Sequence, residues 1–166
     1  GRINTDAVDN SAGVNCSDNE VNIKILLNRL LMDRKLSQKD RDCLLEEMTD
    51  DVSKMVLQNN TYQVQALSLD EANNHAHFDS FTRLTHYLVD SVGLNRELEY
   101  LPDDDELLGR SLNKKGLTRP ELAVLMAYSK MDVNNDLLQQ ASLLEDDYFE
   151  KYLLAAFPPV LQTKYS

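Results

Sequence analysis

Residues 116–130 read GLTRPELAVLMAYSK, and this stretch shows the kind of helix start that recurs along the chain. Thr118 and Glu121 have the spacing of a capping box, in which the Thr oxygen accepts from the Glu N–H and the Glu side chain reaches back. Pro120 is tolerated there, because the first turn of a helix has no partner for its missing N–H. The apolar residues that follow keep helical spacing: Leu122, Leu125 and Met126. We therefore expect a capped helix that packs into a core.

Arg119 lies inside this helix start. Its guanidinium could pair with Glu121 or with another acidic neighbour. Because exposed pairs of this kind contribute little to stability, we expect Arg119 to provide only surface electrostatics.

Similar start signals recur along the chain. Two more capping boxes are predicted at Ser17–Glu20 and Ser68–Glu71. Another helical stretch is expected to start at Ser37. The acids at 103–106 indicate a further helix start, because acidic side chains favour the positive end of a helix dipole. The helix behind Ser68 has an apolar face and a terminating glycine: Phe78, Phe81, Leu84, Leu88, Val92 and then Gly93. Strand signals are scarce.

The helix that follows Ser37 has a predicted break at Thr49, because Thr before two acids is a good N-terminus. Residues 57–67 are then either the end of that helix or a connection. The last helix is expected from about Asp146 to Pro158-Pro159. Residues 1–16, dense in Asp, Asn, Ser and Gly, form the one stretch that does not look helical. The predicted fold is all-α: a multi-helix domain with an irregular N-terminal strap.

Length and composition limit the classes of function that the chain can have. The chain has 166 residues, enough for one domain with a core, and a net charge of −11 that argues against nucleic-acid and anionic-membrane partners. No apolar run approaches a membrane span. Cys16 and Cys43 are expected to be unpaired thiols in a reducing cytoplasm. Since the chain begins at Gly1 and not at Met, we interpret it as part of a longer protein.

Candidates for metal binding and nucleophilic chemistry are weak. His75 and His77 fall on different faces of a helix, and His75 with Asp79 is an ordinary pair, so we expect no metal site. The acidic run at 103–106 lacks the alternating ligands and central Gly of a calcium loop. Cys16 has no nearby base in sequence, so we expect an inert thiol and no catalytic residue in this chain.

Ser17 has two interpretations. As an N-cap, its oxygen accepts a backbone hydrogen bond, and capping boxes are common. As a substrate contact, its hydroxyl donates to a carboxylate, aided by the positive end of the helix. A capping Ser keeps its donor free, so the two roles are partly compatible. The residues alone favour the cap.

The first twenty residues carry a longer pattern around Ser17. The string GRINTDAVDNSAGVNCSDNEVNIKILL contains Asp-x3-Asn-x2-Gly-Val-x2-Ser-x2-Glu, from Asp6 to Glu20. This spacing resembles the segment that closes the active site of glutamate dehydrogenases, and the wider string resembles the large bacterial NAD-dependent branch. Three further stretches resemble that branch: ALSLDE (66–71), LPDDDELLGR (101–110) and GLTRPELAVLMAYSK. The resemblance covers essentially the whole chain.

The resemblance implies roles for individual residues. Ser17 would bind the γ-carboxylate of glutamate, Asn10 would lie by the nicotinamide, and Gly13 would permit close backbone approach. Asp6 is taken as structural. The smaller hexameric enzymes carry aromatic residues where Asp18 and Asn19 stand here. Residues 1–20 would then end the catalytic-domain motif, and residues 21–166 would form a C-terminal helical domain.

The parent protein that the resemblance implies converts L-glutamate, NAD and water to 2-oxoglutarate, ammonia and NADH. The family's catalytic lysine, its acidic partner and a GxGxxG turn have no match here, so NAD would be bound mainly by residues absent from this chain. We expect the chain alone to be inactive. Its partners would be the upstream catalytic domain, the glutamate or 2-oxoglutarate of the parent, and further copies in a homo-oligomer.

The alternative is a non-catalytic, structural or regulatory helical module. In that case the pattern from Asp6 to Glu20 is only a turn and a cap. Six matched positions in one register are hard to obtain from capping alone, which favours the enzyme segment.

Overall fold

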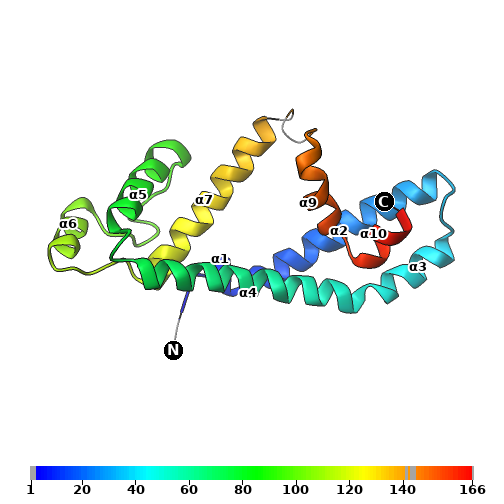
Figure 1. The fold of residues 1–166 in the computed structure, drawn as a ribbon, viewed down its shortest axis with the longest axis horizontal. Coiled ribbons are helices and arrows are strands. Elements are labelled where there is room, and N and C mark those ends of the chain that lie inside the picture. Colours follow the sequence, from blue (N-terminus) through cyan, green and yellow to red (C-terminus); the bar gives the residue numbers. More distant parts are fainter. Residues whose placement is uncertain (1–2, 141, 143–144, 166) are drawn as a thin grey trace. The chain divides into compact units, whose positions relative to one another are not determined.

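The computed structural model describes residues 3–140, 142 and 145–165. Every regular element among these residues is a helix (Figure 1), so the all-α fold class is confirmed. The chain divides into two compact units. One unit consists of Gly1–Asp9 and Tyr62–Gln140, and the other of Asn10–Thr61 and Ala141–Ser166.

The first unit packs its helices around one apolar core. It contains α1 (Asp6–Asp9), the end of α4 (Thr49–Asn73), α5 (Phe78–Val92), α6 (Asp104–Leu112) and α7 (Arg119–Gln139). The predicted apolar face of α5 packs into a core with the start of α7, where Leu122, Ala123 and Leu125 are almost completely buried. Burying such side chains stabilises a fold by about 1.5–3 kcal/mol each.

The second unit has its own smaller core. It contains α2 (Ser11–Met32), α3 (Gln38–Glu47), the start of α4, the 3₁₀ turn η1 (Asp147–Phe149), α9 (Glu150–Ala155) and α10 (Pro159–Tyr165). The buried residues at i, i+4 and i+7 along α2 meet residues of α3, Met48 and α10 in this core: Ile23, Leu27, Leu30, Leu44, Met48 and Leu161.

Several predicted helix ends are confirmed. Ser37 caps α3 by accepting from the Asp40 N–H at 3.1 Å, and Asp103 caps α6 by accepting from the Glu106 N–H at 2.8 Å. The Thr118 capping box is complete. Gly93 ends α5 with φ of 78°, a left-handed conformation that glycine adopts without a steric cost. Asp146 caps η1, close to the predicted start of the last helix.

The irregular strap and the Ser17 capping box need correction. Residues 1 and 2 lie outside the described residues, but α1 begins at Asp6 and α2 already at Ser11. Ser17 and Glu20 therefore lie inside α2, whereas a cap must stand at the junction before a helix. A glycine within a helix costs only about 1 kcal/mol, so Gly13 does not interrupt α2.

The Ser68 capping box also needs correction, because α4 continues through it to Asn73. The Ser68 hydroxyl donates to the Val64 carbonyl at 2.8 Å, the bond that serine commonly makes inside a helix. Residues 57–67 are likewise the interior of α4, neither its end nor a connection. Pro158-Pro159 ends one helix, but Pro159 also begins α10. The predicted domain boundary at residue 20 lies within α2 and stays a prediction.

Candidate functional site

The predicted site residues lie at the start of α2 and directly before it. Asn10 directly precedes the helix, with φ of −113°, ψ of 17° and no side-chain cap bond. Gly13 and Ser17 follow three and seven positions later, a spacing that places side chains on one face of a helix. All three residues are exposed. The helix begins six residues before Ser17, so the positive potential expected at Ser17 from a helix N-terminus is absent there.

Apolar side chains accompany Ser17 on this exposed side. Val14, Val21 and Ile25 are 66%, 52% and 63% exposed, and their spacing puts them next to Gly13 and Ser17 on the helix surface. We call these five residues the Ser17 face. The buried residues of α2 lie on its other side: Asn19, Ile23, Leu27 and Leu30. An exposed apolar stripe on a helix whose opposite side is already buried is typical of an interaction surface.

Two of the charged residues beside the Ser17 face, Lys24 and Glu20, form an ion pair. Lys24 donates to the Glu20 carboxylate one turn earlier, and both side chains are about half exposed. This hydrogen bond from Lys24 lowers the pKa of Glu20. Glu20 therefore serves an intrahelical ion pair and not the predicted cap. An exposed pair of this kind contributes little to stability.

The buried Asn19 gives a reason for part of the departure from the smaller enzymes. Its amide nitrogen donates to the Asn15 carbonyl at 2.8 Å and to the Asn15 side chain at 3.1 Å. A buried amide has to be hydrogen-bonded, and one turn of α2 supplies these acceptors. Asn19 thus faces the interior of its unit, while Asp18 is exposed.

Arg119 is the main residue that sequence reasoning misjudged. It is 7% exposed, not a surface residue, and each of its guanidinium nitrogens donates a hydrogen bond. Nε donates to the Asn4 side chain at 2.6 Å, and one terminal nitrogen donates to Ser68 at 3.2 Å and to Glu71 at 3.0 Å. The other donates to the Val64 carbonyl at 3.2 Å. No pattern in the local sequence predicts these partners, because they lie 48 to 115 positions away.

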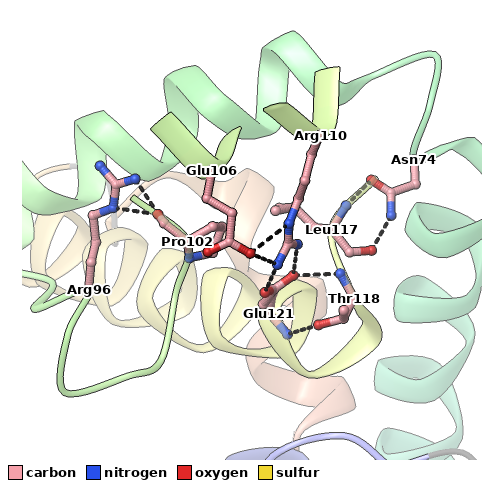
Figure 2. Close-up of polar contacts among 8 residues, drawn as sticks. All are labelled: Asn74, Arg96, Pro102, Glu106, Arg110, Leu117, Thr118 and Glu121. Carbon is pink, nitrogen blue, oxygen red and sulfur yellow. Dashed lines mark hydrogen bonds and ion pairs between the residues drawn. The ribbon is translucent and has the colours of Figure 1, made fainter. Parts of the chain in front are cut away.

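A second set of contacts fixes the turn before α7 (Figure 2). The buried Asn74 accepts from the Leu117 N–H at 3.0 Å and donates to the Leu117 carbonyl. Its side-chain amide therefore makes both backbone hydrogen bonds of Leu117, as the backbone of a neighbouring β-strand would. Figure 2 shows the Asn74 side chain pointing at this backbone. A methyl group at Gly116 would overlap the Asn74 side chain, which explains why this position carries glycine.

Glu121 connects the capping box to α6. Its carboxylate accepts the Thr118 N–H at 2.6 Å and two Arg110 nitrogens at 2.7 and 3.0 Å (Figure 2). Burial would raise the pKa of Glu121, but the hydrogen bonds from Arg110 and Thr118 outweigh it, and the pKa lies below its usual value. Hydrogen bonds to Glu121 and Glu106 raise the pKa of Arg110 despite its partial burial. The polar groups of Thr118 and Glu121 are therefore committed to holding the fold.

Grooves and other candidate sites do not coincide with the predicted residues. One groove of about 430 Å³ runs along another side of α2 and is lined by Cys16 and Glu20 among apolar residues. Cys16 and Cys43 are both free and exposed. In the described part of the chain, no three His, Cys, Asp or Glu side chains gather as metal ligands. No described helix is long and apolar enough to cross a membrane.

Comparisons with known proteins agree with the family resemblance. Residues 1–70 match the family model "Bacterial NAD-glutamate dehydrogenase, catalytic domain", and residues 114–166 match "Glutamate dehydrogenase, C-terminal". An NAD-specific glutamate dehydrogenase of Pseudomonas aeruginosa is 44% identical over 165 residues, which is 99% of this chain. Proteins of the same name from Halomonas elongata and Mycobacterium tuberculosis are 41% and 43% identical over 99% and 100% of it. The chain spans 10% of the length of each of these relatives.

Proposed function

The chain belongs to the family of large bacterial NAD-specific glutamate dehydrogenases, and from this premise we propose that it supplies the substrate side of such an enzyme's active site. The whole protein would oxidise L-glutamate with NAD and water to 2-oxoglutarate, ammonia and NADH. This chain would contribute no catalytic acid, base or hydride carrier. It would close the site over glutamate and support the catalytic domain.

We assign the recognition of glutamate to Ser17. Its exposed hydroxyl can donate one hydrogen bond to the γ-carboxylate of the substrate. A site built around such a donor discriminates against substrates that lack the matching acceptor. Asn10 directly precedes α2 and would lie by the nicotinamide, and Gly13 between Asn10 and Ser17 has no side chain to obstruct either ligand.

The observation that carries the proposal is the Ser17 face itself. Gly13 and Ser17 lie on one exposed side of α2 next to exposed apolar residues, and Asn10, also exposed, directly precedes the helix. Exposed apolar residues grouped in this way are typical of a surface that a partner covers. The segment matched by the catalytic-domain model, residues 1–70, contains the whole of this face. The catalytic domain of the same polypeptide is therefore the partner we propose for it, with the other helices as a supporting or assembly region of a homo-oligomer.

NAD is the cofactor named in the relatives. We propose that the parent binds it mainly through residues outside this chain, because no glycine-rich phosphate turn occurs in the sequence. Asn10 and Gly13 would then influence the nicotinamide end alone. Substitutions on the Ser17 face should accordingly change glutamate kinetics more than NAD affinity.

The test compares Ser17→Ala with Ser53→Ala in the full-length enzyme. Ser53 is an exposed helical serine of the same unit, so it is a matched control. We expect Ser17→Ala to lower kcat/KM for glutamate about 100-fold, since losing a hydrogen bond to a charged group costs about 1.5–3 kcal/mol. The KM for NAD should stay unchanged, as should all kinetics of Ser53→Ala. Wild-type glutamate kinetics in Ser17→Ala would contradict the assignment and favour a purely structural module.

A further inference from the structure

We propose that Arg119 is a positioning residue of the dehydrogenase, which fixes the segment leading into the Ser17 face through Asn4 and Asp9. This inference rests on the proposed function. It starts from Arg119, a buried cation whose nitrogens all make hydrogen bonds within the first unit.

The inner end of this network is anchored on α4. Arg119 donates to the Val64 carbonyl, the Ser68 hydroxyl and the Glu71 carboxylate, which lie at i, i+4 and i+7 along one side of that helix. The ion pair with Glu71 has an N–O distance of 3.0 Å. With three anchors on a rigid helix, the guanidinium has a fixed orientation.

The outer end of the network holds the start of the chain. The Arg119 Nε donates to the Asn4 Oδ1 at 2.6 Å. The Asn4 side-chain nitrogen donates in turn to the Asp9 carboxylate at 2.6 Å, and the Asn4 backbone N–H donates to its other oxygen at 3.1 Å. Asn4 therefore closes a loop around α1 while Arg119 holds Asn4 in place. We call this series the Arg119–Asn4–Asp9 relay.

The relay ends one residue before the candidate site. Asp9 is bonded directly to Asn10, and Asp6, another residue of the sequence pattern, lies in the same short helix. Val8 is buried in the core of the first unit, and α1 packs against α7. A four-residue helix has little stability of its own, so its position has to come from such contacts. The relay supplies a polar constraint on the backbone that leads to Asn10.

The relay also gives a reason for the basic residue in GLTRPELAV. A cap and an apolar face require only Thr118, Glu121 and the leucines. Arg119 adds nothing to the capping box, and its side chain leaves α7 for α4 and Asn4. Its distinctive property is the planar fork of donors, which lysine does not reproduce.

The experiment uses the full-length enzyme and three asparagine variants. Asn4→Ala removes the middle of the relay, and Asn4→Asp keeps an acceptor for Arg119 while replacing the donor to Asp9 with a like charge. Asn95→Ala is the matched control, because Asn95 is an exposed asparagine of the same unit whose side chain accepts from the Leu98 N–H and is not part of the relay. For each variant, kcat, the KM for glutamate, the KM for NAD and the melting temperature are measured.

We expect both Asn4 variants to raise the KM for glutamate about ten-fold, because small misplacements of positioned groups cost large rate factors. Asn95→Ala should keep wild-type kinetics at a similar melting temperature. Arg119→Lys should reproduce the kinetic loss of Asn4→Ala. Unchanged glutamate kinetics in both Asn4 variants would overturn the inference.

Ser17→Ala, measured alongside, separates this inference from the proposed function. Impaired Ser17→Ala with normal Asn4 variants would refute the relay alone. Impaired Asn4 variants with normal Ser17→Ala would refute the Ser17 assignment and support Arg119 as the positioning residue of the enzyme.

Discussion

The start of α2 and the start of α7 carry equally specific sequence patterns, but they use their residues in opposite ways. At α7, the side chains of Thr118, Arg119 and Glu121 are hydrogen-bonded within the chain, and the apolar residues behind them are buried. At α2, Asn10 makes no cap bond, and Ser17 and its apolar neighbours are exposed. The internally satisfied cap of Thr118 and Glu121 indicates a role in stability, and the uncovered apolar residues beside Ser17 indicate a partner.

The largest effect should come from Gly116→Ala at the α7 region. The added methyl group would overlap Asn74, which cannot move without losing both hydrogen bonds to Leu117. Overpacking and the lost bonds should together lower the free energy of unfolding by about 2 kcal/mol. Urea unfolding of the 166-residue chain measures this. Gly109→Ala is the control, since a methyl group there meets open space.

The second-largest loss of stability should come from Glu121→Gln, and it should depend on pH. Its pKa is lower in the folded chain than in the unfolded one, so it contributes stability that is present above its ordinary value of 4.5 and is lost as the pH falls through the folded pKa. Glu121→Gln should cost about 1.5 kcal/mol at neutral pH and flatten the acid side of the stability profile. Urea midpoints recorded from pH 7 to pH 3 test this. A variant as acid-sensitive as the wild type would contradict the role of Glu121.

The smallest effect should come from the α2 region, through Val21→Thr. Val21 is 52% exposed, so the stability of the chain should change by less than about 0.5 kcal/mol. The buried Ile23→Thr, two residues along the same helix, should cost about 2 kcal/mol. If both substitutions cost the same in thermal unfolding, the Ser17 face would be part of the core of the chain and not a surface for a partner.

Local chemistry explains which features could be predicted. Ser37, Asp103, Thr118 and Gly93 act within five residues of their own positions, so their local spacing was enough to predict them. The boxes at Ser17 and Ser68 have the same spacing but lie inside longer helices, because tertiary packing extends α2 and α4 across them. A capping box is therefore informative only where something else ends the preceding helix.

The polar network before α7 could not be predicted from local spacing. Asn74 and Leu117 are 43 positions apart, and Arg119 and Asn4 are 115 apart. Burial of Arg119 also runs against the usual exposure of arginine, and it is possible only because every nitrogen has an acceptor. For the Ser17 face, the roles of Ser17, Asn10 and Gly13 stay predictions that come from the family resemblance.

The most direct test removes one side-chain hydroxyl from each region, with Ser17→Ala at α2 and Thr118→Ala at α7. Urea unfolding of the 166-residue chain and glutamate-dependent NADH formation by the full-length enzyme are measured for both. Thr118→Ala should lose about 1 kcal/mol of stability as an N-cap and keep kcat/KM, whereas Ser17→Ala should keep its stability and lose kcat/KM. Lower stability with unchanged kinetics in Ser17→Ala would contradict the distinction between the two regions.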